Sequence, residues 1–249
     1  MPTYQAFCGD CLKILPTLPE VDTIITDPVW PNCPPGLLPG ADKPYELFNE
    51  ACHLFRCRRL VVVLRSDSDP RFLSGVPSAL PFFRTQILPY VMPGYIGRKL
   101  GGDEIAYCFG EPLPSAPGRR VIPGYAPKVQ PQGRAANGHP CSRALEHFLW
   151  LVKWWSLPGE VVMDPFMGSG TTLVAALLLK RQAIGIEIRD EYFDLALPRI
   201  VDAARALDGH PKRIEGKATD YEHCPLFAAD WESTAEYAKP KRKGGRKAR

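Results

Sequence analysis

The sequence lacks the segments that would attach a protein to a membrane. No run of about 18 uncharged apolar residues occurs in its 249 residues, so we expect no transmembrane helix. The first five residues, Met1 to Gln5, have neither the basic nor the apolar stretch of a signal peptide. Because 45% of the residues are hydrophobic and 23% charged, the chain can bury a core, which excludes global disorder. These features predict a cytoplasmic protein.

Metal-ligand patterns are also scarce. Cys8 and Cys11 have the spacing of a metal or redox site, but no second Cys-x-x-Cys and no His-x-x-x-His occurs among eight cysteines and five histidines. A zinc site needs a fuller set of ligands. We therefore expect reduced thiols, several of them small core residues, and no metal site.

The excess of positive over negative charge is confined to one end of the chain. The formal net charge is +4, but residues 239–249 contain seven Lys or Arg and no acid, and the rest has 24 basic against 27 acidic residues. The chain is thus a slightly acidic body, predicted as a domain over residues 1–207, with a polar tail over 208–249. The basic end of the tail could follow phosphates or serve as a solubilising segment, and both interpretations remain open.

Short apolar runs alternate with helical patterns along the body. This alternation predicts an α/β fold, a Rossmann-like, doubly wound and mostly parallel seven-stranded sheet. The strands expected at Gln86–Val91 and Glu104–Phe109 are too close in the sequence for a crossover helix between them. We therefore expect this pair to form an antiparallel hairpin. Helices are expected at 45–57, 142–156, 170–181 and 190–206. Strands are expected at Tyr4–Phe7, Asp22–Thr26, Leu60–Leu64, Gln86–Val91, Glu104–Phe109, Val161–Met163 and Ala183–Ile188.

The role of the proline clusters and of two tryptophans is left open by the sequence. Prolines cluster at 28–44 and within 111–138, where long connections are expected, and long connections in compact domains are commonly functional. Trp150 and Trp154 fall outside the apolar stripe of the helix at 142–156. They either pack under a loop or line a homodimer contact.

A glycine turn between a strand and a helix marks a ligand site. The strand at Val161–Met163 runs into Asp164, Gly168-x-Gly170 follows, and Glu187 stands about 20 residues further on, where an acid can bind ribose hydroxyls. The third glycine of the dinucleotide pattern is missing, and Asp164 would repel a pyrophosphate. S-adenosylmethionine, with its ammonium, sulfonium and ribose, suits both acids. The alternative is a tight turn with an incidental aspartate.

A second strand ends in a similar way. Asp27-Pro28-Val29-Trp30 follows the apolar run Asp22–Thr26, and the carboxyl ends of strands in open α/β sheets face the ligand crevice. The Asp27 carboxylate and the Pro28 carbonyl could accept hydrogen bonds from an amino group, and Trp30 offers a flat face for stacking. Alone, the tetrapeptide could equally be a turn with a core tryptophan.

In this order the motifs resemble a known family. The chain is similar to the β-class DNA amino-methyltransferases, which form N6-methyladenine or N4-methylcytosine. In that circularly permuted arrangement an Asp-Pro-Pro-aromatic motif precedes the cofactor motif. The resemblance covers residues 4–203 and includes the segment His139-Pro140-Cys141-Ser142-Arg143, which is similar to the family's His-Pro-x-x-Lys-Pro. It implies S-adenosylmethionine as cofactor, double-stranded DNA as partner, and a bacterial or phage-encoded enzyme.

The resemblance also assigns roles to single residues. Asp27, Pro28 and Trp30 would be catalytic, acting on a base flipped out of the duplex. The first residue of the catalytic motif, an aspartate, favours adenine N6 over cytosine N4. Val29 stands where the family has a second proline, which puts the rigidity of that loop in doubt. The cofactor would be bound by Asp10, His139, Ser142, Arg143, Asp164, Phe166, Gly168, Ser169, Gly170, Thr171 and Glu187.

Recognition of the DNA sequence is expected in the loop at 111–138. This loop has a single acid, Glu111, and four basic residues that could bind phosphates or guanine: Arg119, Arg120, Lys128 and Arg134. The alternative is a solvated basic loop. Other functions remain open as well: an RNA or protein-amide methyltransferase, a catalytically weak DNA-binding relative, and, least favoured, an NAD-dependent oxidoreductase.

Overall fold

The computed structural model describes residues 3–91, 94–96, 99–116, 121–130 and 138–206. Contacts divide the chain into two units, one of which comprises residues 1–114 and 122–212. The fold described below is that of this unit. The domain boundary predicted at residue 207 coincides with the end of the described residues, and it stays a prediction.

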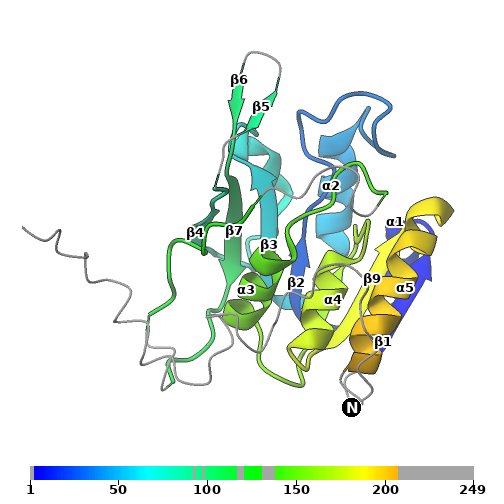
Figure 1. The fold of residues 1–249 in the computed structure, drawn as a ribbon, viewed down its shortest axis with the longest axis vertical. Coiled ribbons are helices and arrows are strands. Elements are labelled where there is room, and N and C mark those ends of the chain that lie inside the picture. The colour runs from blue at the N-terminus through cyan, green and yellow to red at the C-terminus, as the bar shows by residue number, and fades with distance from the viewer. Residues whose placement is uncertain (1–2, 92–93, 97–98, 117–120, 131–137, 207–249) are drawn as a thin grey trace, which may run out of the picture. The chain divides into compact units, whose positions relative to one another are not determined.

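Seven strands form one sheet in the order β1-β9-β8-β2-β3-β7-β4 (Figure 1). The pairs from β1 to β3 are parallel, whereas β7 is antiparallel to both β3 and β4. The predicted seven-stranded, mostly parallel sheet with an antiparallel pair is therefore confirmed. The strands are β1 (Tyr4–Cys8), β2 (Val21–Thr26), β3 (Cys57–Arg65), β4 (Phe82–Leu88), β7 (Glu104–Gly110), β8 (Val161–Asp164) and β9 (Gln182–Glu187).

The connection from β4 to β7 holds a separate two-stranded hairpin, formed by β5 (Gly94–Ile96) and β6 (Lys99–Gly101). The sequence did not predict it, because three-residue strands are too short to show a periodic pattern. Three short helical segments, α1 (Cys11–Ile14), η1 (Leu15–Thr17) and η2 (Pro70–Gly75), were missed for the same reason.

The helix α2 (Pro44–Leu54) covers one face of the sheet. Pro44 occupies the first turn, where its missing N–H costs nothing. Phe48 belongs to the same buried cluster as Leu60, Val62 and Leu64 of β3. These alternate residues share one face of the strand. The intervening Val61 and Val63 are also fully buried, so the opposite face of β3 is covered too.

On that opposite face, α3 (Leu145–Trp155), α4 (Thr171–Leu178) and α5 (Asp190–Ala206) lie side by side (Figure 1). The hydroxyl of Thr23 in β2 donates to the carbonyl oxygen of Trp155 at 2.8 Å, which ties α3 to the strand. Helices on both faces confirm the doubly wound arrangement. No helix in the described part of the chain has the length and apolar character needed to cross a bilayer.

Two tryptophans of α3 are buried within the chain. Trp150 is 3% and Trp154 2% exposed, and their ring centroids lie 6.5 Å apart. Of the two interpretations that the sequence left open, the structure supports internal packing, because side chains this deeply covered cannot line a contact with a second copy.

Candidate active site

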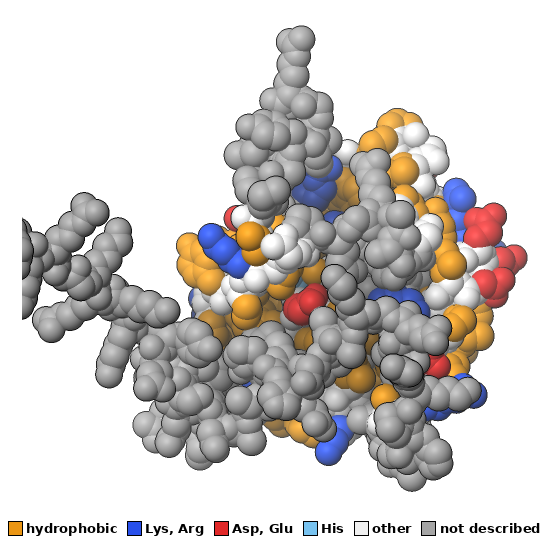
Figure 2. Space-filling model, viewed as in Figure 1, with side chains coloured by type: hydrophobic (Ala, Val, Ile, Leu, Met, Phe, Trp, Pro, Cys, Tyr) orange, Lys and Arg blue, Asp and Glu red, His pale blue; other side chains and the backbone are white. Residues whose placement is uncertain are grey.

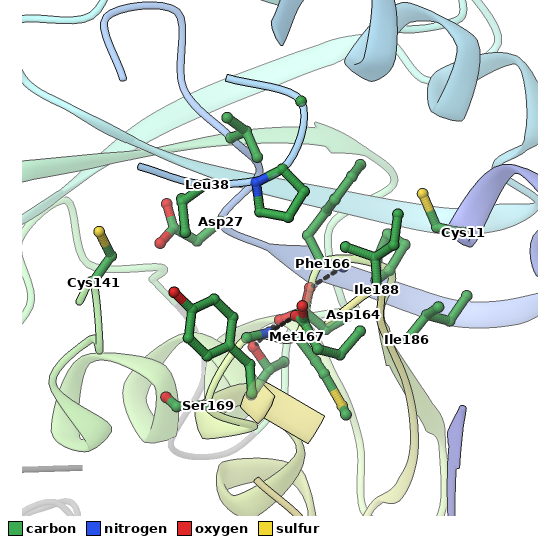
Figure 3. A pocket seen from close by; sticks show the side chains of 18 of the residues that line it. Cys11, Asp27, Leu38, Cys141, Asp164, Phe166, Met167, Ser169, Ile186 and Ile188 are labelled. Carbon is green, nitrogen blue, oxygen red and sulfur yellow. Dashed lines mark hydrogen bonds between the residues drawn. The ribbon is translucent and has the colours of Figure 1, made fainter. Parts of the chain in front are cut away.

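The carboxyl ends of four parallel strands open onto a cavity of about 280 Å³. An acid stands at or after each end: Asp10 after β1, Asp27 after β2, Asp164 in β8 and Glu187 in β9. Figure 3 shows Asp27 and Asp164 among the side chains around this cavity. Of the residues predicted for the site, the cavity is lined by Asp10, Asp27, Trp30, His139, Arg143, Asp164, Phe166, Gly168, Ser169, Thr171 and Glu187.

Asp164 is oriented by donors that carry no charge. Its Oδ1 accepts from the Thr26 hydroxyl at 2.8 Å and from the backbone N–H of Phe166 at 3.0 Å, and its Oδ2 from the Thr172 hydroxyl at 2.5 Å. Burial raises the pKa of Asp164 to about 6, although these donors oppose the shift. At neutral pH the side chain is therefore a fixed carboxylate whose charge is not cancelled by these partners.

Glu187 is held in a similar way. Its Oε2 accepts from the backbone N–H of Gly168 and its Oε1 from that of Arg189, both at 2.9 Å. Burial raises its pKa, and the backbone donors lower it. The carboxylate thus joins the glycine turn to the end of β9 and lines the cavity, where it can accept further hydrogen bonds from hydroxyl groups.

The two glycines of the turn adopt left-handed backbone conformations. Gly168 has φ +48°, and a Cβ there would lie 3.1 Å from Nε2 of His139. Gly170 has φ +77° and caps the N-terminus of α4, beside the cavity. Because only glycine adopts such angles without strain, the spacing Gly168-x-Gly170 is required by this turn.

Asp10 caps a short helix on the side of β1. Its carboxylate accepts from the backbone N–H of Leu12 at 2.9 Å. The preceding Gly9 donates its N–H to the carbonyl of Glu187 at 2.7 Å, which brings Asp10 to the same cavity as the glycine turn. The three acids attributed to cofactor binding, Asp10, Asp164 and Glu187, therefore surround one space.

His139 is a buried, neutral side chain. Burial, together with the guanidinium groups of Arg143 and Arg199, lowers its pKa to about 4. Its Nδ1 accepts from the backbone N–H of Cys141 at 3.2 Å, and its ring packs edge-on against Tyr192, with 4.3 Å between the centroids. It therefore shapes one wall of the cavity as an uncharged group.

Hydroxyl groups join the His-Pro segment to the glycine turn. The hydroxyls of Ser142 and Ser169 are 3.1 Å apart, and those of Ser169 and Thr171 are 3.3 Å apart. Arg199 of α5 donates to the carbonyl of Ser169. Ser142 thus lies beside the cavity rather than on its lining, where it supports Ser169.

The head group of Arg143 contacts Asp27, the first residue of the predicted catalytic motif. Its Nε donates to Oδ2 of Asp27 at 2.5 Å and its Nη2 to Oδ1 at 2.9 Å, while its Nη1 donates to Oε1 of Glu104 at 2.6 Å. Burial raises the pKa of Asp27, and Arg143 opposes this shift. The part that was predicted for Arg143 in cofactor binding stays a prediction; the contacts of its head group are with Asp27 and Glu104.

Trp30 is buried, although it touches the cavity. The residue is 5% exposed, and the Arg143 guanidinium carbon lies 5.3 Å from a ring centroid. Its Nε1 has no hydrogen-bond partner among the described residues. A base can stack on this ring only after neighbouring groups move, so the stacking role of Trp30 stays a prediction. Pro28 follows Asp27 directly and is also buried.

Sequence reasoning missed several groups that complete the site. Glu104 is 4% exposed, and its Oε2 accepts from the Tyr90 hydroxyl at 3.1 Å. An acid that begins an apolar strand was a usable signal, since such a residue is rarely buried without a partner. The other missed residues, each of which contacts a predicted one, are Thr26, Thr172, Tyr192 and Arg199.

The predicted DNA-binding loop is described only in part. Arg119, Arg120 and Arg134 lie outside the described residues, and Lys128 is exposed. Residues 122–130 follow the edge of β4, with parallel bridges at Ile87–Tyr125 and Tyr90–Val129. This segment therefore covers a sheet edge rather than extending freely. Among the described side chains visible in Figure 2, basic groups are scattered and form no broad patch.

The described residues include no group of three or more His, Cys, Asp or Glu that could hold a metal ion. Cys8 and Cys11, which have the metal-like spacing, are free thiols. The Cys8 thiol donates to Oδ1 of Asp190 at 2.8 Å, and Cys11 is buried in the core cluster. Their environment is therefore that of a surface thiol and a core residue.

Comparison with known proteins gives matches to DNA methylases. Residues 97–198 match the family model N6_N4_Mtase, described as DNA methylase. YubD of Escherichia coli (strain K12), named as a methylase, is 28% identical over 217 residues, which are 80% of this chain and 91% of YubD.

Two solved structures resemble the fold. The crystal structure of M1.HpyAVI in complex with SAM has a TM-score of 0.61 at 22% identity and covers 80% of this chain and 99% of that one. PvuII DNA methyltransferase, which is cytosine-N4-specific, has a TM-score of 0.61 at 16% identity, over 84% of this chain and 94% of that one.

Proposed function

The chain belongs to the family of N6-adenine and N4-cytosine DNA methylases, and from this premise we propose that it transfers a methyl group from S-adenosylmethionine to N6 of adenine in double-stranded DNA. The observation that carries this proposal is that two kinds of binding group share one cavity. Asp164 and Glu187 beside the glycine turn suit a cationic nucleoside, and Asp27 suits an amino group.

The residues at the turn fit the cofactor. Asp164 and Glu187 are both oriented by neutral donors, and their carboxyl oxygens suit a ligand with an ammonium, a sulfonium and ribose hydroxyls. A side chain at Gly168 would crowd His139. Because glycine has none, a ligand can approach the backbone closely at this position. When bound, S-adenosylmethionine supplies a methyl group activated by positive sulfur.

Asp27 is the acceptor that prepares the amino group. An exocyclic amine conjugated with a base is a weak nucleophile, because its lone pair is shared with the ring. Hydrogen bonds from its two hydrogens to the Asp27 carboxylate and the Pro28 carbonyl would draw the nitrogen toward tetrahedral geometry. The same acceptors would stabilise the positive charge that develops on nitrogen during transfer. The base must first leave the duplex to reach this cavity.

Adenine is proposed over cytosine because the catalytic motif begins with Asp27 rather than serine. Cytosine N4 is the second candidate, and it is supported by the resemblance of the fold to a cytosine-N4-specific enzyme. The chemistry at the amino nitrogen is the same in both cases, so the product distinguishes them.

The test is incubation of the full-length chain with methyl-labelled S-adenosylmethionine and unmethylated double-stranded phage DNA. The DNA is then digested, and its nucleosides are separated. We expect label in N6-methyl-2′-deoxyadenosine of the DNA digest. Label in N4-methyl-2′-deoxycytidine would overturn the choice of base, and label in RNA but not in DNA, from a parallel reaction, would overturn the substrate. An absence of transfer to every nucleic acid would contradict an active methyltransferase.

A further inference from the structure

One guanidinium connects the groups that would contact the target base. Arg143 donates two hydrogen bonds to Asp27 and one to Glu104, and it packs over the ring of Trp30. The side chains of Arg143 and Asp27 are 15% and 14% exposed, and that of Glu104 is 5% exposed. A two-pronged contact of this kind fixes both the distance and the plane of a carboxylate.

Glu104 is itself held from a second side. It is the first residue of β7, and its Oε2 accepts from the hydroxyl of Tyr90 at 3.1 Å while its Oε1 accepts from Arg143. Burial and the nearby Glu104 raise the pKa of Tyr90, so its hydroxyl remains a donor at neutral pH. Tyr90, Glu104, Arg143 and Asp27 therefore form one continuous chain of contacts.

The contact leaves Asp27 able to bind a base. A carboxylate has about four lone-pair positions on its two oxygens, and Arg143 takes one on each. One position on each oxygen remains for an amino hydrogen. We propose that Arg143, held by Glu104, is a positioning residue that keeps the Asp27 carboxylate ionised and correctly placed for the amino group of the target base. This proposal rests on the function proposed above.

The charges around Asp27 support this role. Burial raises the pKa of Asp27 and Glu104 raises it further, while the charge and hydrogen bonds of Arg143 lower it. Loss of Arg143 would therefore raise the pKa of Asp27, and the acceptor would be neutralised at a higher pH. The charged or titratable groups that interact with Asp27 are Arg143, Glu104, Asp164, Cys33 and Tyr90.

The first test compares methyl transfer to unmethylated phage DNA by Arg143→Ala, Arg143→Lys and wild type across pH. Misplacement of a reacting group by about 1 Å can cost about 100-fold in rate, so we expect kcat of Arg143→Ala to fall by about that factor at pH 7. The acidic limb of its pH profile should move upward. Arg143→Lys keeps the positive charge but loses the two-pronged contact with Asp27. Its kcat should therefore fall, while the acidic limb of its pH profile should stay at the wild-type pH. Arg71→Ala, an exposed arginine paired with Asp69, is the control.

Guanidinium ion provides the second test. Added at tens of millimolar, it should restore part of the kcat of Arg143→Ala and leave wild type and Arg71→Ala unchanged. Two opposite results are possible: guanidinium could inhibit Arg143→Ala, or Arg143→Ala could transfer methyl faster than wild type in the absence of guanidinium. Either would mean that Arg143 occupies the place of the target base and must move away before the base can bind. Such a result would overturn the proposal, as would an unchanged pH profile in Arg143→Ala.

A third measurement does not depend on methyl transfer. Carboxyl-labelled aspartate is followed by ¹³C NMR during a pH titration of the full-length chain, and Asp27 is assigned with Asp27→Asn. We expect the Asp27 signal to titrate at higher pH in Arg143→Ala, and in the uncharged Arg143→Gln if the alanine variant does not fold, with Arg71→Ala unchanged. An unmoved Asp27 signal overturns the positioning role. Failure of wild type to methylate DNA would instead overturn the proposed function alone.

Discussion

At one end of the cavity, Asp164 and Glu187 accept hydrogen bonds from hydroxyl and backbone N–H groups, which carry no charge. At the other end, Asp27 lines the cavity and shares the guanidinium of Arg143 with Glu104. Both pairs consist of acids at or near strand ends, and all four are buried except Asp27, whose side chain is 14% exposed. They differ in the charge of their partners rather than in their own chemistry.

This difference supports the proposal that the two ends bind different ligands. Neutral donors orient a carboxylate but leave its negative charge in place, which favours a cation. A guanidinium cancels half of the formal charge of the two acids that it joins, which makes this end less attractive to a cation and favours an uncharged planar group that needs hydrogen-bond acceptors. We therefore expect a sulfonium nucleoside at the end with Asp164 and Glu187, called the cofactor end below, and a neutral base at the end with Asp27, called the acceptor end.

The largest expected effect is a loss of methyl transfer without a loss of cofactor binding. Replacing Asp27 by alanine removes the proposed acceptor for the amino group, and methyl transfer should fall by about 10³-fold or more, because such a group stabilises charge that develops in the transition state. Binding of S-adenosylmethionine, measured by calorimetry, should persist because Asp164 and Glu187 are untouched.

Asp69→Asn, at a half-buried acid outside the cavity lining, is the matched control and should retain both properties. Near-normal turnover in Asp27→Ala would show that the acceptor has been misassigned. Loss of cofactor binding in the same variant would instead show that the two ends are not independent.

A smaller effect is expected from two matched substitutions at opposite ends. Glu187→Gln removes a carboxylate that faces the cofactor, and S-adenosylmethionine should bind about 10- to 100-fold more weakly, as for loss of a hydrogen bond to a charged group. Glu104→Gln makes the same change at the acceptor end and should alter cofactor affinity by less than about twofold. Equal losses in the two variants would remove the distinction between the ends.

The strands and their acids were predictable because the signals are local. The runs Asp22–Thr26 and Val161–Met163 are short and apolar, and parallel strands meet with their carboxyl ends at one edge, so Asp27 and Asp164 were expected in one crevice. The glycine turn was predictable for the same reason, since Gly168-x-Gly170 encodes its own backbone geometry.

The contacts between distant segments were not predictable. Arg143 and Asp27 are 116 residues apart in the sequence, and their pairing depends on how the His-Pro segment crosses the end of β2. Glu104 joins them from the antiparallel hairpin, whose register no local pattern specifies. The burial of Trp30 follows from the same convergence. The sequence therefore predicted the ligand groups at strand ends, but not the ion pairs that join them.

The pH dependence of cofactor binding tests the uncancelled charge directly. Burial raises the pKa of Asp164 to about 6 in the free protein. A bound cation favours the ionised form and lowers this pKa, so affinity for S-adenosylmethionine should weaken as pH falls through about 6, and binding near that pH should release a proton. Calorimetry in buffers of different ionisation enthalpy measures the release. Affinity that stays constant between pH 5 and 7.5, roughly the window around this pKa, would contradict a charged role for Asp164.

The smallest expected effect comes from the neutral donors themselves. The Thr172 hydroxyl donates to Oδ2 of Asp164 and lowers its pKa, so Thr172→Val should raise the pH at which cofactor affinity is half lost, by about half a unit to one unit for one hydrogen bond. Thr26→Val, which removes the donor to Oδ1, should act in the same direction, whereas Thr172→Ser keeps the hydroxyl and should restore the wild-type midpoint. A midpoint that does not move in either valine variant would mean that another group controls binding. Movement in both, with rescue by serine, would show that uncharged donors tune the acid that attracts the cofactor.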